Sequence, residues 1–166
     1  MPFDLARLYN EHAPALYAFL LNFTRSDAES RDAVQEVFVR LAEKPGRLDG
    51  VRDPRGFLLR LAHHIAIDAS RRRTAHASAV ERAGREPMEL FAEASSADEQ
   101  AFRDSVSGAL ATLPEEQRAV VHLKIWEDQT FAEIAETLGI PANTAASRYR
   151  YALDKLEALL RPICAP

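Results

Sequence analysis

The chain has 166 residues, 47% of them hydrophobic, so it can form one ordinary domain or two small ones, and wholesale disorder is excluded. Its single cysteine excludes an internal disulfide and a cysteine-based zinc site. The net charge of −4 by itself argues against a nucleic-acid partner, but the distribution of charged residues along the chain reverses that inference.

The N-terminus lacks the basic-then-apolar pattern of a secretory signal, and no apolar run reaches the roughly 20 residues that span a bilayer. We therefore expect a cytoplasmic protein without membrane insertion. The small number of glycines and the absence of strict apolar/polar alternation favour helices over strands.

Three helices are predicted in the first 73 residues. The first spans about residues 4–22, and the second follows a capping-box pattern at Ser26 and Glu29 and stops before Pro45. The third begins at Asp53, a cap followed by proline at the first helical position, and ends in an arginine cluster. The expected core residues are Leu5, Leu8, Leu16, Phe19, Phe23, Val34, Val37, Phe38, Leu41, Phe57, Leu58, Leu61, Ile65 and Ala69.

The charge changes sign after the third helix. Residues 51–73 hold six arginines against two aspartates, a local balance of +4, whereas residues 74–105 hold seven acidic against three basic residues, a local balance of −4. Residues 74–95 contain Pro87 and show no sustained hydrophobic period. They are predicted to be a flexible acidic linker with one short helical turn around residues 88–92.

Four further helices are predicted in residues 96–166. Capping boxes at Ser96 and Thr130 open two of them, Leu113-Pro114 begins another, and the last ends at about Leu160, before Pro162. The fold class is therefore all-α: two small helical domains, 1–73 and 96–166, joined by the linker 74–95. The expected core residues here are Val106, Leu110, Val120, Val121, Ala145, Tyr149, Leu156 and Leu160, together with Phe102, Ile125, Trp126 and Leu153.

Residues 131–151 have the spacing of a helix-turn-helix, in which the second helix enters the major groove. Ala135 is small where the two helices approach each other, and Gly139 lies where the chain turns sharply. At about 100° per residue, Thr144, Ser147 and Tyr151 point outward, with Arg148 and Arg150 on opposite flanks. Hydroxyls between two arginines suit base recognition between two phosphate backbones, so DNA binding is favoured over a plain helical hairpin with solvated arginines.

Several stretches resemble the extracytoplasmic-function (ECF) group of bacterial RNA polymerase sigma factors. Residues 113–118 (LPEEQR) and 131–141 (FAEIAETLGIP) resemble their region 4. Residues 32–41 (DAVQEVFVRL) resemble the region 2 helix that grips the polymerase clamp, and residues 53–62 (DPRGFLLRLA), with the arginine cluster that follows, resemble the helix that reads the −10 element. The resemblance is specific because both halves occur in this order, and it covers all but the linker and the extreme ends.

The resemblance implies a division of labour. The first domain is expected to bind core RNA polymerase and open the −10 element of promoter DNA, and the second to read the −35 element. An anti-sigma factor is a further expected partner. The acidic linker is expected either to occupy a basic channel of the polymerase or to be a solvated spacer. The expected polymerase-binding residues are Asp32, Gln35, Glu36, Val39 and Arg40. The expected DNA-binding residues are Arg55, Arg60, His63, Arg71, Arg72 and Arg73 on the third helix, and Asn143, Thr144, Ser147, Arg148, Arg150 and Tyr151 on the last.

One pair of residues departs from the family pattern. Ala145-Ala146 stands where the family more often has a β-branched residue and a polar or basic one, so not all of the family's −35 contacts are expected in this chain.

Stacking of unpaired DNA bases on an aromatic side chain has little support in the first domain, because Phe57, the one aromatic residue in 45–73, lies on the apolar stripe. A flipped base would have to be held by the loop 46–53.

No catalytic or metal site is expected. His64 and Asp68 are four residues apart on one helix, but no third ligand is evident. No phosphate-cradling glycine loop and no Ser/His/Asp spacing occurs. We therefore expect no cofactor, no metal and no small-molecule substrate, and a protein that is not an enzyme.

Two alternatives stay open. A helix-turn-helix regulator that acts without polymerase leaves the clamp-like segment unexplained. A sigma-like protein-interaction module without DNA binding is supported by Ala145-Ala146 and by the acidic balance.

Overall fold

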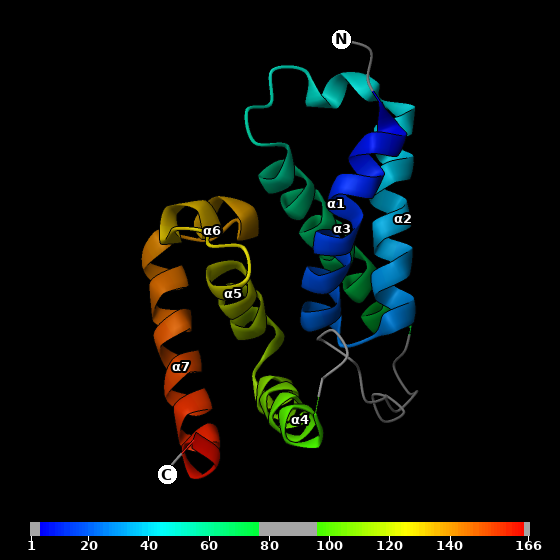
Figure 1. Cartoon of the computed structure of the whole chain (residues 1–166). Helices are drawn as coiled ribbons and strands as arrows, with labels where there is room; N and C mark the ends of the chain where they lie inside the picture. The colour runs from blue at the N-terminus through cyan, green and yellow to red at the C-terminus, as the bar shows by residue number, and fades with distance from the viewer. Residues whose placement is uncertain (1–3, 77–95, 165–166) are drawn as a thin grey trace. The chain divides into compact units, whose positions relative to one another are not determined.

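The structure, a computed structural model, describes residues 4–76 and 96–164. Within these ranges it consists of seven α-helices and one 3-10 turn, without strands, as the all-α prediction required (Figure 1). The elements are α1 (Leu5–Thr24), α2 (Asp27–Glu43), η1 (Pro45–Leu48), α3 (Pro54–His76), α4 (Ala97–Thr112), α5 (Glu115–Ile125), α6 (Phe131–Leu138) and α7 (Ala142–Cys164).

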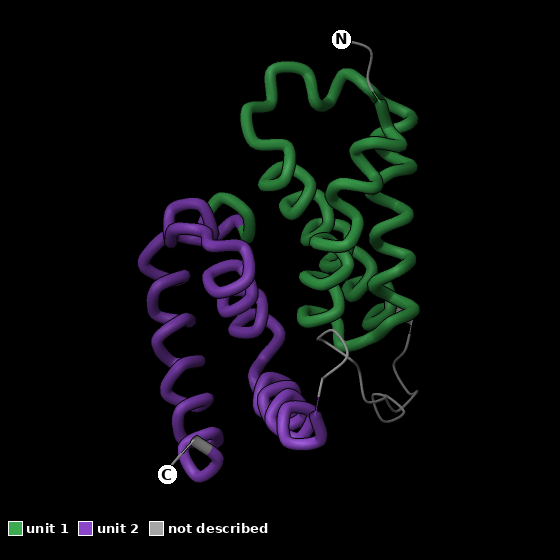
Figure 2. Tube along the Cα trace, viewed as in Figure 1, with its two compact units in different colours: residues 1–86, 136–138 green, residues 87–135, 139–166 purple. Residues whose placement is uncertain are grey.

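The chain divides into two compact units, residues 1–86 with 136–138 and residues 87–135 with 139–166 (Figure 2). Most of the predicted linker 74–95, including the turn expected at 88–92, lies outside the described residues. Its first residues are described, and they belong to α3, which continues to His76 instead of ending at the arginine cluster. Neither glycine nor proline occurs between Arg73 and His76, so nothing in the local sequence stops the helix there.

In the first unit, α1, α2 and α3 pack against one another around one apolar core. The predicted core residues on α2 are all buried, and so are most of those on α1 and α3; Leu5, Leu8, Phe57 and Ala69 are only half-buried. Leu59 and Ala62, which the apolar stripe did not include, are fully buried. Because α3 packs against both α1 and α2, its buried arc is wider than a stripe facing one neighbour.

The helix ends in this unit are fixed by side-chain caps. The Asp4 carboxylate accepts the Arg7 amide hydrogen bond at 3.0 Å at the start of α1. Ser26 Oγ accepts the Glu29 amide hydrogen bond at 3.3 Å at the start of α2. The other half of the predicted capping box is replaced, because the Ser26 amide donates to Thr24 Oγ1 at 3.2 Å. Glu29 turns instead to Arg73 on α3, with which it forms an ion pair.

A polar contact also joins α1 to α2. The Tyr17 hydroxyl donates to Asp27, which also accepts a hydrogen bond from Arg31 Nε at 3.0 Å. The hydrogen bond from Tyr17, with a further contribution from Arg31, lowers the pKa of Asp27 below its usual value. Burial, followed by the contact with Asp27, raises the pKa of Tyr17.

In the second unit, α7 packs against α5 and α4. Its core contains Leu110, Leu113, Val121 and Ala152, with Val106, Tyr149 and Leu156 packed around them. Ala152 was not predicted; it takes the inward position that had been expected of Leu153, which is exposed. The helix also continues past Pro162 to Cys164, so the predicted stop at that proline is wrong.

Three further core predictions in this unit are wrong, because Phe102, Ile125 and Trp126 are exposed. Trp126 is the C-cap of α5 and is 42% exposed, and its ring stacks on His122 with 5.3 Å between centroids. The buried face of α5 instead carries Arg118 and His122 beside the apolar residues. Arg118 Nη1 donates to the carbonyl oxygen of Leu113, the C-cap residue of α4.

Candidate nucleic-acid and polymerase interfaces

Helix α6 and the turn after it form the first half of the helix-turn-helix. Both halves of the predicted capping box at Thr130 are present: Thr130 Oγ1 accepts the Glu133 amide hydrogen bond at 3.2 Å, and Glu133 Oε2 accepts that of Thr130 at 2.9 Å. Gly139 caps α6 in the left-handed conformation at φ 68°, which glycine adopts without strain. The turn therefore fixes where α7 begins.

Helix α7 presents the predicted DNA-reading face. Ala145 and Ala152 are buried behind that face, and Tyr151 is 55% exposed on it. Asn143 is exposed, whereas Thr144 and Ser147 are half-buried. The burial of Ala145 explains half of the departure from the family pattern at Ala145-Ala146. The Ala145 side chain packs inside the unit and is not available to contact a base.

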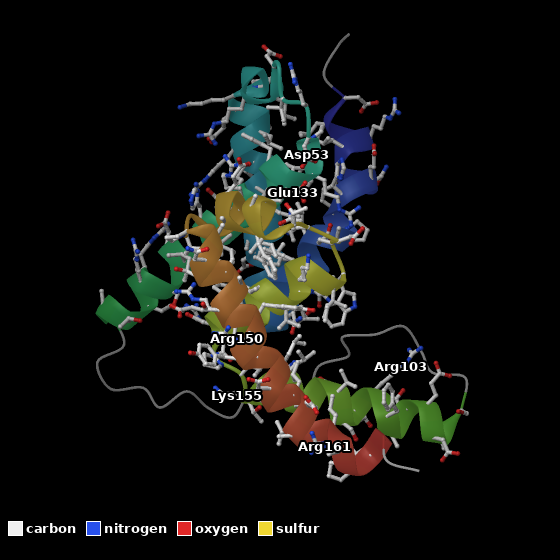
Figure 3. All side chains as sticks on the ribbon, turned by 90° about the vertical axis from the view of Figure 1, so that its left-hand side faces the viewer. Asp53, Arg103, Glu133, Arg150, Lys155 and Arg161 are labelled. Atoms are coloured by element: carbon white, nitrogen blue, oxygen red, sulfur yellow. The ribbon has the colours of Figure 1, made fainter. Side chains whose placement is uncertain are left out.

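The two arginines that flank this face have different surroundings. Arg150 is exposed, and its Cζ lies 5.5 Å from the centroid of the Tyr151 ring, a cation–π contact. Figure 3 shows Arg150 on α7, followed along that helix by Lys155 and Arg161. Arg148 Nη2 lies 3.7 Å from Oε2 of Glu116, which belongs to α5. The helical wheel did not predict this acidic partner of Arg148.

On α3, Arg60, Arg71 and Arg72 are exposed, as is Arg55 in the first turn. Arg73 is also accessible, but it pairs with Glu29 of α2. The Glu29 carboxylate therefore partly neutralises the Arg73 guanidinium, which had been expected to contact a DNA phosphate.

The expected outward position of His63 is wrong. Its ring lies 5.4 Å from the Phe23 ring and 6.5 Å from the Phe19 ring, centroid to centroid, so it packs against α1. Burial, with the nearby His64 as a second cause, lowers the pKa of His63 from 6.5 to about 4. A neutral ring packed beside two phenylalanines is a poor phosphate contact, so His63 is withdrawn from the DNA-binding set.

The predicted polymerase-binding residues lie on the side of α2 away from the core. Asp32 and Gln35 are exposed, and Val39 is 49% exposed. Glu36 and Arg40 are half-buried and form an ion pair, with 2.9 Å between Arg40 Nε and Glu36 Oε1. An exposed valine among charged side chains suits a protein interface.

Among the described residues, no group of three or more His, Cys, Asp or Glu side chains could hold a metal ion. Over the same residues, none of the helices is both long enough and apolar enough to span a membrane.

Known proteins match both halves of the chain. The model of Sigma-70 region 2 matches residues 8–76, which hold α2, α3 and most of α1, and that of Sigma-70 region 4 matches residues 109–158, which hold the helix-turn-helix. The ECF RNA polymerase sigma factor SigL of Mycobacterium tuberculosis is 34% identical over 160 residues, covering 94% of this chain and 88% of SigL. This chain belongs to the ECF sigma factors. Sigma factors are transcription-initiation factors.

Other sigma factors extend the comparison. CarQ of Myxococcus xanthus is 30% identical over 154 residues, covering 92% of this chain and 87% of CarQ. Among solved structures, the sigma factor RpoE of Bartonella quintana, crystallised with the anti-sigma factor NepR, has a TM-score of 0.75. It is 18% identical, and the match covers 96% of this chain and 98% of the RpoE chain, so the fold is that of a sigma factor.

Two acidic residues that contact the candidate interfaces, Glu29 and Glu116, were not predicted from the sequence. Each pairs with an arginine on another helix, far away in the sequence. Glu29 could be recognised only as a capping residue, and Glu116 only as an acidic residue in the first turn of a helix. No local pattern identifies a partner that helix packing brings close.

Proposed function

We propose that this sigma factor binds core RNA polymerase through the exposed side of α2, contacts the −10 element through α3, and reads the −35 element through α7. Residues 1–73 then carry polymerase binding and −10 recognition, residues 96–166 carry −35 recognition, and residues 74–95 link the two. A protein that works in this way acts in the cytoplasm.

The observation that carries the proposal is the surface of α7. Ala145 and Ala152 are buried on its inner side, and Asn143, Arg150 and Tyr151 are exposed on its outer side, directly after a capped helix and a glycine turn. This arrangement supports insertion of α7 into the major groove, where side chains distinguish base pairs. Arg55, Arg60, Arg71 and Arg72 on α3 support contact with phosphates.

Protein partners follow from the same proposal. The similar RpoE chain was solved with the anti-sigma factor NepR, which supports an anti-sigma factor as a partner of this chain too. The side of α2 around Val39 supports binding of polymerase, because an apolar side chain ringed by charges is the usual centre of such a contact.

Run-off transcription with core polymerase tests the proposal. The chain is added to core enzyme on a fragment library of its own genome, and the starts of the transcripts are mapped. We expect a small set of defined start sites that are absent with core enzyme alone. Transcription from these sites should be abolished when Val39 is replaced with Arg.

Two other results would contradict the proposal in different ways. A chain that retards specific duplexes but confers no start sites would be a regulator that acts without polymerase. A chain that binds core polymerase but neither retards DNA nor confers start sites would be an interaction module.

A further inference from the structure

The two arginines that flank the DNA-reading face of α7 differ in accessibility. The Arg148 side chain is 29% exposed, and its Nη2 lies 3.7 Å from Glu116 Oε2. Arg150 is exposed, and its charge lies over the ring of Tyr151, a neutral partner. The two flanks therefore differ in charge, because a carboxylate lies beside Arg148 and an aromatic ring beside Arg150.

The position of Glu116 follows from the packing of the second unit. Pro114 is the N-cap of α5, Glu115 and Glu116 lie in its first turn, and α5 packs against α7. The Glu116 side chain is 63% exposed, so its carboxylate is accessible at the edge of the face where a DNA backbone would approach.

An accessible carboxylate beside an arginine acts on DNA in two ways. It is a competitor, because a phosphate must displace it to contact the guanidinium. It is also an anion that repels the approaching backbone. An ion pair this exposed is weak, so the arginine can exchange the carboxylate for a phosphate, but with less gain than an unpaired arginine would provide.

We propose that Glu116 is a positioning residue of the DNA interface, which holds Arg148 towards α5 and competes with DNA phosphates for it. The inference rests on the proposed −35 function of α7. Glu116 thereby lowers sequence-independent affinity, to which phosphate contacts contribute most, and leaves discrimination to residues that face the bases.

The salt dependence of DNA binding tests this competition. The full chain is titrated with a 30-base-pair duplex of random sequence at several salt concentrations. We expect Glu116→Gln to tighten binding about threefold to tenfold at low salt, and to steepen the slope of log K against log salt by about 0.9, the value for one additional phosphate contact.

The matched control is Glu115→Gln. It removes the same charge from the same helical turn, and the described residues show no ion pair for Glu115. We expect its slope to equal that of the wild type. Glu116→Asp keeps the charge but shortens the reach, so its slope should shift in the same direction as that of Glu116→Gln. This variant separates the position of the carboxylate from its charge.

Coincident slopes for Glu116→Gln and Glu115→Gln, with normal helical content by circular dichroism, would overturn the inference and leave the proposed function intact. An effect of Glu116→Gln that persists at full size in an Arg148→Ala background would also overturn it. Failure of the wild-type chain to bind any duplex, alone or with core polymerase, would instead remove the DNA-reading role of α7, and this inference with it.

Discussion

Asp53 and Gly56 form a matched pair at the start of α3. Asp53 Oδ1 accepts the Gly56 amide hydrogen bond at 3.0 Å, and a Cβ atom added at position 56 would lie 2.3 Å from Asp53 Oδ2. The cap therefore occupies the space that any other side chain at position 56 would need. Glycine at position 56 therefore lets the Asp53 cap form without displacement of its carboxylate, although glycine disfavours helix.

This pair predicts that the effect of Gly56→Ala on the free energy of unfolding depends on whether Asp53 is present, which a double-mutant cycle measures. Gly56→Ala alone should leave stability unchanged or lower it, because about 1 kcal/mol of helix propensity is offset by loss of the cap, worth a similar amount. In an Asp53→Ala background the same change should stabilise by about 1 kcal/mol. Chemical denaturation measures the coupling, and additive effects of the two changes would show that the contact does not form.

The side of α2 that we propose to bind polymerase gives a second prediction. Replacing Glu36 and Val39 with Arg should abolish binding to core polymerase in a pull-down while circular dichroism stays unchanged. The fold should survive because the Glu36–Arg40 pair is partly exposed, and such pairs contribute little stability.

The control for that experiment is a variant with Ala6 and Asn10 changed to Arg, which adds positive charge to exposed positions of α1. It should bind core polymerase normally. Retention of binding by the α2 variant would remove this side of α2 from the proposed interface.

A third prediction concerns pH. The pKa of His63 is lowered from 6.5 to about 4, so the unfolded chain takes up a proton on this residue before the folded chain does. Stability contributed by the neutral ring is complete above pH 6.5 and is lost as the pH falls from 6.5 towards 4. The slope at its steepest approaches about 1.4 kcal/mol per pH unit.

Denaturant unfolding between pH 7.5 and 4.5 measures this loss of stability. Unfolding of the first unit is followed by the NMR signal of a backbone amide in α1. His63→Phe should flatten the profile, because a phenylalanine ring fills similar space beside Phe19 and Phe23 without titrating. His64→Gln, at an exposed position, should keep most of the slope. A His63 ring that titrates at its ordinary pKa by NMR would contradict the prediction.

The linker gives a fourth prediction. If the part of the predicted linker that follows α3, residues 77–95, is flexible, limited proteolysis should cut there first and release two fragments that stay helical. Mass spectrometry of the first products locates the cut. Preferred cleavage within 5–73 or 97–160 would contradict the two-domain division.

The outer face of α7 gives a fifth prediction, which separates affinity from specificity. Arg150→Ala should weaken binding to all duplexes equally and flatten the salt slope by about one counterion. Ser147→Ala and Tyr151→Ala should change the preferred sequence instead, by about 1–3 kcal/mol for each base that the variant no longer reads. Titration of a mapped −35 duplex and a scrambled one distinguishes the two. Equal weakening on both duplexes for Tyr151→Ala would exclude a base contact by that residue.

The sequence by itself determined the features that depend on neighbours within one helical turn. The helix order, the caps at Asp4, Ser26, Asp53, Ser96 and Thr130, and the left-handed turn at Gly139 all follow from local hydrogen bonding and backbone conformation. The outward position of Tyr151 on α7 follows from helical periodicity alone. These features were predictable because the residues that form each one lie within four positions of one another.

Only the tertiary structure decided which faces pack and which charges meet. The His63 ring lies inward because α3 packs against the phenylalanines of α1. Trp126 is exposed at the end of α5, of which it is the C-cap residue. The Glu29–Arg73 and Glu116–Arg148 pairs join residues on different helices. A single helix wheel shows which side chains share a face, but the neighbours of that face are chosen by how the helices pack.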